Sequence, residues 1–566
     1  MSTEKNKEVS KTKKINSIIK FNIMAIILIA IFCIALTPVT LQNDTFYTIK
    51  IGEHIVKDGI DMQDPFSWHE NLAYTYPHWA YDVITYFIYN SFGMTGIYVT
   101  TCILSAILGI SIYLVNTKLA KNQILSFLIT IGVMYLIREY IAARAQLVTF
   151  ILFILTIFFI EKFLESKKKR YAIGLIIIPI LIANLHLAVF PFYFVLYLPY
   201  IAQYIIACFA ETIIYRKTTV RQLKNKIKKL SKMENQEEKL SEAKKELKEL
   251  EEKIDKIKIK RSKELQNPYK IKLNRNDNVK WLILIMIICL FTGLLTPLGT
   301  TPYTYLVKTM QGNTTQNINE HLPMTITNET EVICTLILFL AMLIFTKVKI
   351  RLSDLFMLGG LCYLMLASRR QITMFALVCS LIFNRLIMDL ISQYTKIKLE
   401  DIMKKITSAI GIISISIIML GFSYYMAKDK INDSYIDEST YPVQACDYIL
   451  NNIDLGQARF YNEYNYGSYM LYRGIPVFID SRADLYAPEF NETVNENGEK
   501  ESRNIFSDYI NTSTIGTYYE NTMEKYNITH VILTKKSKLN MFISRDSSYR
   551  ELYSDDNFVI YERLEK

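Results

Sequence analysis

Long apolar runs recur along this chain and are separated by strongly polar segments. An apolar run of 18 or more residues can cross the roughly 30 Å hydrocarbon core of a bilayer as an α-helix. The pattern predicts spans at residues 18–38, 95–115, 124–138, 146–164, 172–190, 192–213, 281–298, 331–347, 354–368, 371–392 and 406–427. We therefore expect a polytopic α-helical membrane protein with about eleven transmembrane helices.

The polar segments divide the chain into regions. In order, these are a cytoplasmic tail (1–17), a first transmembrane part (18–213) with an external loop (39–94), a Lys/Glu-rich segment (214–280), a second transmembrane part (281–429) and a C-terminal region (430–566). Loops rich in Lys and Arg alternate with loops poor in both, which is the pattern of cytoplasmic and external loops. This alternation predicts a cytoplasmic N-terminus and an external C-terminal region, in the plasma membrane of a bacterial cell.

The Lys/Glu-rich segment and the C-terminal region have patterns of their own. Two series of apolar residues at helical spacing lose their phase across residues 231–238, which predicts a coiled-coil-like helical hairpin. The two series are Val220, Leu223, Ile227 and Leu230, and then Leu240, Ala243, Leu247, Leu250, Ile254 and Ile257. The C-terminal region predicts a small α/β domain. Its expected elements are a helix at 442–452 and strands at Arg459–Asn462, Val477–Asp480, His530–Thr534 and Phe558–Arg563.

Charge and cysteine usage exclude several classes of function. The formal net charge is +11, but residues 216–279 hold 21 Lys/Arg against 11 Asp/Glu, while the remaining residues hold 44 against 43. The excess is therefore local, and no nucleic-acid partner is expected. Seven of the eight cysteines lie in apolar spans without Cys-x-x-Cys spacing, which argues against a disulfide or a zinc site. Since Gly-rich phosphate loops are absent, an ATP-driven pump is also disfavoured.

Polar and ionisable residues gather at the external ends of the predicted spans. Asp44 follows the first span, where its carboxylate could accept a proton from an acceptor hydroxyl or could simply cap a helix. Arg369 and Arg370 break the positive-inside trend, and their forked donors match phosphate oxygens, although headgroup contact is the alternative. The other polar candidates at span ends are Arg144, Asn184, His186, Glu320 and His321.

The external domain adds an aromatic and charged segment. Tyr466 and Tyr469 offer flat faces for stacking on a sugar, and Asp480 and Arg482 end a predicted strand where polar groups can converge. Alternatively, the tyrosines belong to an aromatic core and Asp480 with Arg482 is a structural ion pair.

These groups together resemble membrane glycosyltransferases of the GT-C superfamily, which use polyprenyl-phosphate-linked sugars on the external face. The segment from Asn319 to Thr325 (Asn-Glu-His-Leu-Pro-Met-Thr) is similar to the Ser-Glu-His-Gln-Pro-Thr-Thr loop of the oligosaccharyltransferase catalytic subunit, whose Glu contacts the acceptor. Asn465–Tyr469 is similar to its Trp-Trp-Asp-Tyr-Gly motif, with Asp480 after a strand as in that family. The order of these motifs along the chain supports the resemblance more than any one of them.

The chain also departs from that family. Ala142–Gln146 takes the position of the family's Asp-x-Glu metal motif, and Asn465 stands where the Asp of Trp-Trp-Asp would be. Both changes argue against asparagine glycosylation and leave a divalent metal in doubt; no other cofactor is implied. The sequence resembles more closely a group of bacterial GT-C-like proteins with an Asp-Pro-Phe-Ser loop, here at Asp64, and a Gly-x-Tyr-Leu and Val-Phe-Ile-Asp-x-Arg segment, here Gly467–Leu471 and Val477–Arg482.

The resemblance implies transfer of a sugar from a polyprenyl-phosphate donor to an external glycan, lipid or protein. It assigns Asp44 and Glu320 to catalysis, and Arg369 and Arg370 to the donor phosphate with Arg144 in reserve. The expected acceptor residues are His186, Asn184, His321, Tyr466, Tyr469, Asp480 and Arg482. A lipid-linked glycan transporter and a non-catalytic scaffold, with the hairpin as a surface for a cytoplasmic partner, remain as alternatives. The sequence identifies neither the donor sugar nor the acceptor.

Overall fold

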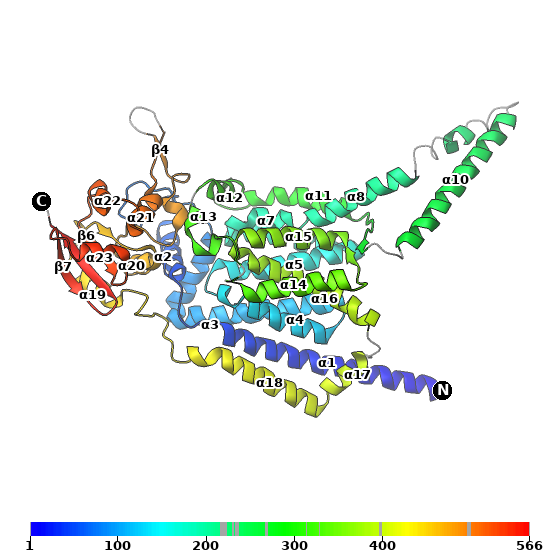
Figure 1. Ribbon diagram of the computed structural model, residues 1–566, viewed down its shortest axis with the longest axis horizontal. Coiled ribbons are helices and arrows are strands. Elements are labelled where there is room, and N and C mark those ends of the chain that lie inside the picture. Colours follow the sequence, from blue (N-terminus) through cyan, green and yellow to red (C-terminus); the bar gives the residue numbers. More distant parts are fainter. Residues whose placement is uncertain are drawn as a thin grey trace.

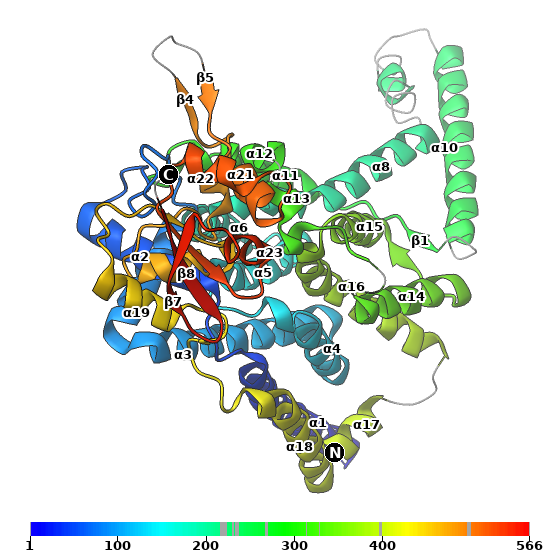
Figure 2. The ribbon, with the colours of Figure 1, turned by 60° about the vertical axis from the view of Figure 1, so that its left-hand side comes forward.

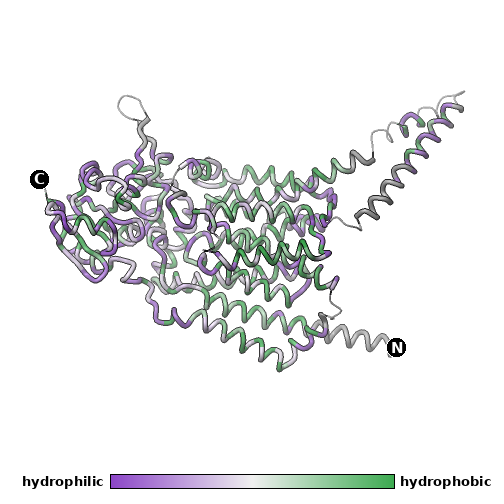
Figure 3. The backbone as a smooth tube through the Cα atoms, in the orientation of Figure 1, coloured by the Kyte–Doolittle hydropathy of each residue, from purple (hydrophilic) through white to green (hydrophobic). Residues whose placement is uncertain are grey.

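The computed structural model describes residues 2–215, 223–228, 231, 237–265, 270–312, 314–325, 327, 329–394, 399–494 and 500–564. Most of its helices run side by side along the long axis, and a small domain with a sheet covers one end of this bundle (Figure 1). The bundle helices are largely hydrophobic, whereas the terminal domain mixes hydrophilic and hydrophobic segments (Figure 3). The sequence of α10 (Glu237–Leu265) is rich in Lys and Glu. The distribution is that of a membrane protein with polar regions at both ends.

The long helices correspond to the apolar runs of the sequence. The bundle comprises α1 (Ser2–Leu36), α3 (Trp79–Ala120), α4 (Gln123–Leu136), α5 (Ala145–Ser166), α6 (Lys169–Leu185), α7 (Phe190–Val195), α8 (Leu198–Tyr215), α11 (Val279–Leu290), α14 (Thr330–Phe345), α15 (Leu352–Ala367), α16 (Ile372–Tyr394), α17 (Leu399–Ile406) and α18 (Ala409–Ala427). Shorter helices near the terminal domain are α2 (Asn43–Asp58), α12 (Thr301–Gln311) and α13 (Thr314–Asn317).

Six helical stretches are long and apolar enough to cross a membrane. They are Asn16–Leu36, Trp79–Ala120, Ala145–Ser166, Leu187–Ala210, Arg369–Tyr394 and Ala409–Lys430. Four shorter apolar helices are Gln123–Leu136, Val279–Leu294, Thr330–Phe345 and Leu352–Ala367. A membrane protein is thus supported by length and composition, while the count of about eleven spans and their orientation remain predictions.

The N-terminus and α10 lie at the end of the bundle opposite the terminal domain (Figure 1). At the side of the bundle, α18 packs along α1, where the rings of Phe32 and Phe422 stack at 5.1 Å (Figure 2). In the predicted hairpin, residues 223–228 are helical, and Lys224 Nζ lies 2.9 Å from Glu251 Oε1 of α10. Val220 and Leu230 of the first apolar series lie outside the described residues, so the hairpin and the region boundaries stay predictions.

The terminal domain is built on a four-stranded sheet in the order β3-β6-β8-β7. Strand β3 (Phe460–Tyr461) is parallel to β6 (His530–Thr534), and β8 (Phe558–Arg563) runs antiparallel to both β6 and β7 (Tyr549–Ser554). Its helices are α19 (Val443–Asn452), α20 (Tyr464–Tyr472), α21 (Ile505–Ser513), α22 (Tyr519–Lys525) and α23 (Lys538–Ile543). Two two-stranded pairs complete the described structure: β1 (Ile271–Lys272) with β2 (Ile350–Arg351), and β4 (Glu492–Val494) with β5 (Lys500–Ser502).

One strand prediction in this domain is wrong. Val477–Asp480 forms no strand, although Val477 makes an isolated bridge with Ser67 of the first external loop. The Asn462 side chain replaces a neighbouring strand: its Oδ1 accepts from the Phe478 amide at 2.8 Å, and its Nδ2 donates to the Ile479 carbonyl at 2.7 Å. Because a side chain satisfies these backbone groups, the segment is buried without joining the sheet.

The first external loop and the terminal domain are joined by a buried ionic cluster. Arg482 donates to Asp64 Oδ1 at 2.7 Å and to Asp480 Oδ2 at 2.7 Å, and the three side chains are almost fully buried. Burial alone would raise the pKa of Asp64, but the Arg482 guanidinium outweighs it and holds this pKa below its usual value. Tyr486 also donates to Asp480 Oδ2. Two segments about 400 residues apart thus share one desolvated charge network.

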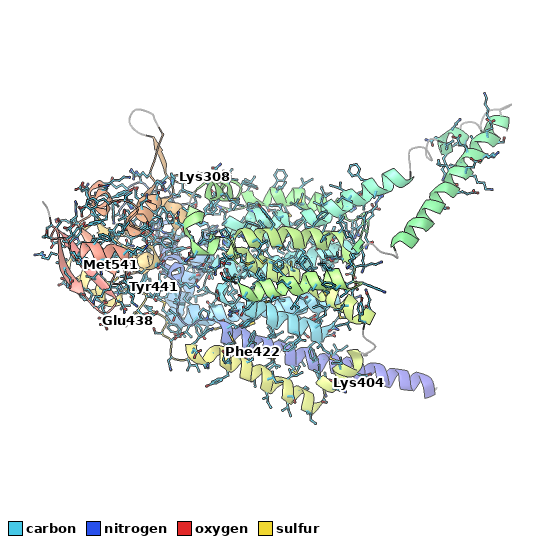
Figure 4. The ribbon with its side chains drawn as sticks, viewed as in Figure 1. Lys308, Lys404, Phe422, Glu438, Tyr441 and Met541 are labelled. Atoms are coloured by element: carbon cyan, nitrogen blue, oxygen red, sulfur yellow. The ribbon has the colours of Figure 1, made fainter. Side chains whose placement is uncertain are left out.

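Aromatic contacts strengthen the same junction. The Trp68 indole donates to the Phe460 carbonyl at 2.9 Å, and His69 Nε2 lies 2.9 Å from the Phe478 carbonyl. Tyr441, labelled in Figure 4, donates to the Leu41 carbonyl at 2.9 Å from the domain side. The domain is therefore fixed on the external loop and not tethered by a flexible linker alone.

We predict that Arg482→Met lowers the free energy of unfolding by roughly 3–5 kcal/mol, because it leaves two buried carboxylates without a cation. Thermal unfolding of the full chain in detergent measures the effect. Arg550→Met is the matched control, since Arg550 pairs with Glu562 but is 63% exposed, and should change stability by less than about 1 kcal/mol. Equal effects of the two substitutions would contradict the structural role of the buried cluster.

Candidate functional site

A cavity of about 920 Å³ lies between the bundle and the terminal domain. Its lining comes from α2, the loop before α3, Arg144 before α5, residues 186–192, α12, residues 314–321, the end of α15 with residues 368–371, and parts of 464–513 in the terminal domain. The volume is within the range of small-molecule sites, which are concave and carry a few converging polar groups. The candidate residues that line it are Asp44, Arg144, His186, Glu320, His321, Arg370 and Arg482.

Arg144 lies between two carboxylates in this cavity. Its Nε is 3.0 Å from Asp44 Oδ2, and its Nη1 is 3.3 Å from Glu320 Oε1. Arg144 is the residue immediately before α5, Asp44 is in the first turn of α2, and Glu320 is in a 3₁₀ turn, Asn319–His321. Burial would raise the pKa of Glu320, but Arg144 and Arg370 outweigh it and lower this pKa. The arrangement keeps Glu320 ionised in neutral solution.

The two neighbouring arginines are separated by the structure. Arg370 lines the cavity, and its Nη2 donates to Gln146 Oε1 at 3.2 Å. Arg369 lies outside the cavity lining and forms an ion pair with Glu329 Oε1 at 3.0 Å. The backbone around them is fixed because the Arg369 amide donates to the Leu322 carbonyl at 3.0 Å, which docks this turn on the Glu320 turn. Arg370 is therefore the arginine of the pair that can meet a ligand in the cavity.

His186, His321 and Asn184 differ in their surroundings. His186 lines the cavity and its Nδ1 lies 2.8 Å from the Thr149 hydroxyl. His321 also lines the cavity, where burial, followed by the charge of Arg370, lowers its pKa to about 4. Asn184 instead accepts from the Trp79 indole at 3.2 Å and donates to the Leu295 carbonyl at 2.9 Å, so it connects helices outside the cavity lining.

The candidates in the terminal domain are mostly structural. Tyr466 is 1% exposed and donates to the Ile532 carbonyl at 2.8 Å, while Tyr469 is 2% exposed and packs against Phe46. The expectation that their faces stack on a sugar is corrected, because both rings lie in the hydrophobic core. Asp480 is fully buried beside Arg482, as the ion-pair alternative predicted.

The segment beside these tyrosines nevertheless reaches the cavity. Tyr464, Asn465, Ser481 and Asp484 belong to its lining. Gly467 lets α20 lie close to the Ile479 backbone, since a Cβ there would lie 2.0 Å from the Ile479 carbonyl oxygen. The Tyr464–Arg473 segment therefore faces the cavity through its first residues, while its later tyrosines point into the domain.

Two residues that line the cavity, Asp484 and His78, were not among the site candidates from the sequence. Asp484 lines the cavity, where burial raises its pKa, and it accepts a hydrogen bond from the Tyr305 hydroxyl at 2.5 Å. His78 lines it from the loop before α3. The spacing His78–Asp82 (i, i+4) at a helix start was the available signal, because it can bring a carboxylate onto the imidazole.

The residues at this site do not fit a divalent metal. Arg144 occupies the space between Asp44 and Glu320 and already compensates their charge. Among the described residues, no group of three or more His, Cys, Asp or Glu side chains could hold a metal ion. The segment Ala142–Gln146, which lacks the Asp-x-Glu metal motif, instead supplies the Arg144 guanidinium between Asp44 and Glu320.

Comparisons with known proteins support the architecture alone. No family model matches the sequence, and no curated protein matches it. The structure is similar to the crystal structure of the Archaeoglobus fulgidus oligosaccharyltransferase in the apo form, with a TM-score of 0.50 and 11% sequence identity. The match covers 91% of this chain and 69% of that chain. At this identity the likeness is one of fold, and it supports a distant structural relationship to an oligosaccharyltransferase.

We predict that Arg144→Met destabilises the protein by about 1 kcal/mol at pH 7, because Asp44 and Glu320 lose the guanidinium that pairs with both. The value is small since Glu320 is 38% exposed. In the wild type, the lowered pKa of Glu320 stabilises the fold above the ordinary pKa, and this contribution disappears as pH falls through the lowered value. The stability difference between the two proteins should therefore shrink toward acidic pH. Unfolding midpoints between pH 2 and 7 test this, and a difference that stays constant down to the lowest pH would contradict it.

Proposed function

We propose that the protein is a GT-C-type membrane glycosyltransferase that moves a sugar from a polyprenyl-phosphate donor to an extracytoplasmic acceptor. The observation that carries the proposal is the cavity where Asp44, Glu320, Arg144 and Arg370 converge. About eleven spans, a cytoplasmic N-terminus and a bacterial plasma membrane belong to the same proposal. The fold-level likeness to an oligosaccharyltransferase supports it.

The donor phosphate is assigned to Arg370. A guanidinium offers parallel N–H donors that match phosphate oxygens, and Arg370 lines the cavity beside Gln146. The cavity also has apolar lining from membrane helices and α12, including Phe192, Leu306 and Leu364. A charged anchor next to apolar walls suits a ligand with a phosphate head and an isoprenoid tail.

The transfer step needs an oriented acceptor and a stabilised leaving group. The acceptor oxygen attacks the anomeric carbon, the bond from this carbon to the phosphate oxygen breaks, and the phosphate leaves with the electron pair. Arg370 stabilises the charge that grows on the phosphate. Asp44 and Glu320 accept hydrogen bonds from the molecule that receives the sugar. Asp44 is the candidate base that the sequence offers.

Two alternatives make different demands on the molecule. A lipid-linked glycan transporter moves its substrate across the membrane without breaking the glycosidic bond, and a scaffold has no substrate. Neither accounts for the meeting of Asp44, Glu320, Arg144 and Arg370 in one cavity. A transferase uses all four groups, and the transfer reaction is therefore the favoured function.

We predict that cells lacking the protein accumulate one polyprenyl-phosphate-linked sugar and lose one surface glycan, as measured by mass spectrometry. The wild-type chain should restore both. Asp44→Asn keeps the side-chain size but removes the carboxylate, so transfer should fall by roughly 10²–10⁴-fold. Unchanged lipids and glycans in the deletion strain would favour the scaffold. Accumulation with undiminished transfer in detergent extracts would favour the transporter.

We also predict that Arg370→Gln and Arg369→Gln differ. The first removes a guanidinium from the cavity and should weaken donor binding by about tenfold or more, in the range of a lost charge-assisted hydrogen bond. The second breaks the Arg369–Glu329 pair outside the lining and should leave donor binding unchanged. Binding of the accumulated lipid to the purified variants measures the contrast, and equal weakening by both would contradict the assignment.

A further inference from the structure

Three polar residues beside Asp44 form a chain that reaches from the cavity into the protein. Tyr47 of α2 and His78, which immediately precedes α3, both line the cavity. Behind them, Asp82 in the first turn of α3 is fully buried. Burying a carboxylate costs free energy unless the group is paired, and the partner of Asp82 is His78.

The distances and the chemistry of the Asp82 carboxylate together indicate the direction of the hydrogen bonds. His78 Nδ1 lies 2.7 Å from Asp82 Oδ1, and His78 Nε2 lies 3.2 Å from the Tyr47 hydroxyl. An ionised carboxylate can only accept, so Nδ1 of the imidazole carries the hydrogen. The neutral imidazole then has its lone pair at Nε2, toward the Tyr47 hydroxyl. The order is that of a proton acceptor oriented by a buried acid.

The packing of α2 on α3 holds this geometry. A Cβ at Gly52 would lie 2.1 Å from the Asp82 carbonyl oxygen, so only glycine permits so close an approach of the two helices. The rings of Tyr47 and His78 stack at a centroid distance of 5.8 Å. Asp44 and Tyr47 are three residues apart on α2 and therefore share one face of the helix.

The surrounding charges favour proton uptake by His78. Burial would lower its pKa, but the Asp82 carboxylate outweighs burial and raises this pKa above its ordinary value. Burial and the charge of Asp44 also raise the pKa of Tyr47, so its hydroxyl stays protonated. The charged and titratable groups that face His78 are Asp82 from α3, Asp44 and Tyr47 from α2, Arg144 at the start of α5, and His186 after α6.

We propose that Tyr47, His78 and Asp82 form a relay that takes the proton released by the sugar acceptor, an inference that rests on the proposed function. As the acceptor oxygen bonds to the anomeric carbon, its proton passes to the Tyr47 oxygen while the Tyr47 proton passes to His78 Nε2. The electron pair of the broken bond leaves with the phosphate. Asp82 stabilises the imidazolium, which later returns the proton to solvent through the same path.

Asp44 then has a different task from the relay. Its Oδ2 lies 3.0 Å from Arg144 Nε, so the Asp44 carboxylate is already held in an ion pair. Asp44 and Arg144 therefore orient the acceptor, and the imidazole removes the proton. The acid that the sequence offered as the base becomes a positioning group, and the base is His78, which was not among the candidates from the sequence.

The kinetic test uses membrane vesicles supplied with the polyprenyl-phosphate sugar that accumulates in cells lacking the protein. His78→Gln should lower kcat by roughly 10²–10⁴-fold, and Tyr47→Phe by about 10²-fold, with KM nearly unchanged. Wild-type activity should fall as pH decreases through the raised pKa of His78, above the ordinary value of about 6.5. This acidic limb should vanish in His78→Gln.

His54 provides a matched control. It forms the same (i, i+4) histidine–aspartate pair, with Nδ1 3.1 Å from Asp58 Oδ2, but lies outside the cavity lining. His54→Gln should leave both the rate and the acidic limb unchanged. Wild-type rates and pH profiles in Tyr47→Phe and His78→Gln, together with a loss in Asp44→Asn, would overturn the relay and leave the transferase standing. Loss of activity in His54→Gln equal to that in His78→Gln would also overturn it.

A second measurement does not depend on activity. The chain has six histidines, so ¹⁵N-histidine NMR of the wild-type protein, with Tyr47→Phe and His54→Gln for assignment, can follow each ring. The relay requires that neutral His78 is protonated at Nδ1 and that Tyr47→Phe shifts its Nε2 resonance. A neutral His78 protonated at Nε2, or a resonance unaffected by Tyr47→Phe, would overturn the relay whatever the lipid experiment shows.

Discussion

The buried guanidinium of Arg482 is the constraint on which the junction between the terminal domain and the loop 39–94 depends. Its side chain is 3% exposed and bonds Asp64 and Asp480 at 2.7 Å each. Desolvating three charges is expensive, so the cluster persists only when all partners are present. Because Asp64 belongs to the first external loop and Asp480 to the terminal domain, the cost of separating these two regions is an uncompensated buried charge. The wall of the cavity is therefore set by a charge requirement, and aromatic packing around Trp68 and Tyr441 completes it.

Sequence patterns predicted the parts of the fold that depend on local physics. The apolar runs became helices, and Phe558–Arg563 became a strand with the predicted bounds. Val477–Asp480 has the same β-branched and aromatic composition, yet it forms no strand because Asn462 takes up its backbone groups. Strand pairing depends on residues that are distant in the sequence, so a run of apolar residues does not indicate its partner.

Part of the site could be predicted because polar and ionisable residues gather at one end of the predicted spans. Asp44, Arg144, Glu320 and Arg370 come from four distant segments but were all expected on the same side, and the cavity contains them. The tyrosines failed as ligand candidates because a tyrosine in a domain core and one in a site have the same local sequence. The Tyr466 hydroxyl donates a hydrogen bond to the Ile532 carbonyl inside the domain, whereas Tyr464, two residues earlier, lines the cavity. Helix phase separates them, and the start of α20 was not evident from the sequence.

Arg482 and Arg144 show how one arrangement acquires two roles. Each places a guanidinium between two carboxylates from different segments, but the Arg482 side chain is 3% exposed and that of Arg144 is 25% exposed. In the first case the oxygens are enclosed and the ion cluster fixes the fold. In the second, Asp44 and Glu320 both line the cavity, so the same pairing holds two carboxylates ready for a ligand. A cation supplied by the chain has a consequence for the chemistry, because it stays in place and occupies the two carboxylates that it holds. The proton acceptor is then a separate group, and His78, oriented by a buried acid and beside Tyr47 in the same cavity wall, has that position.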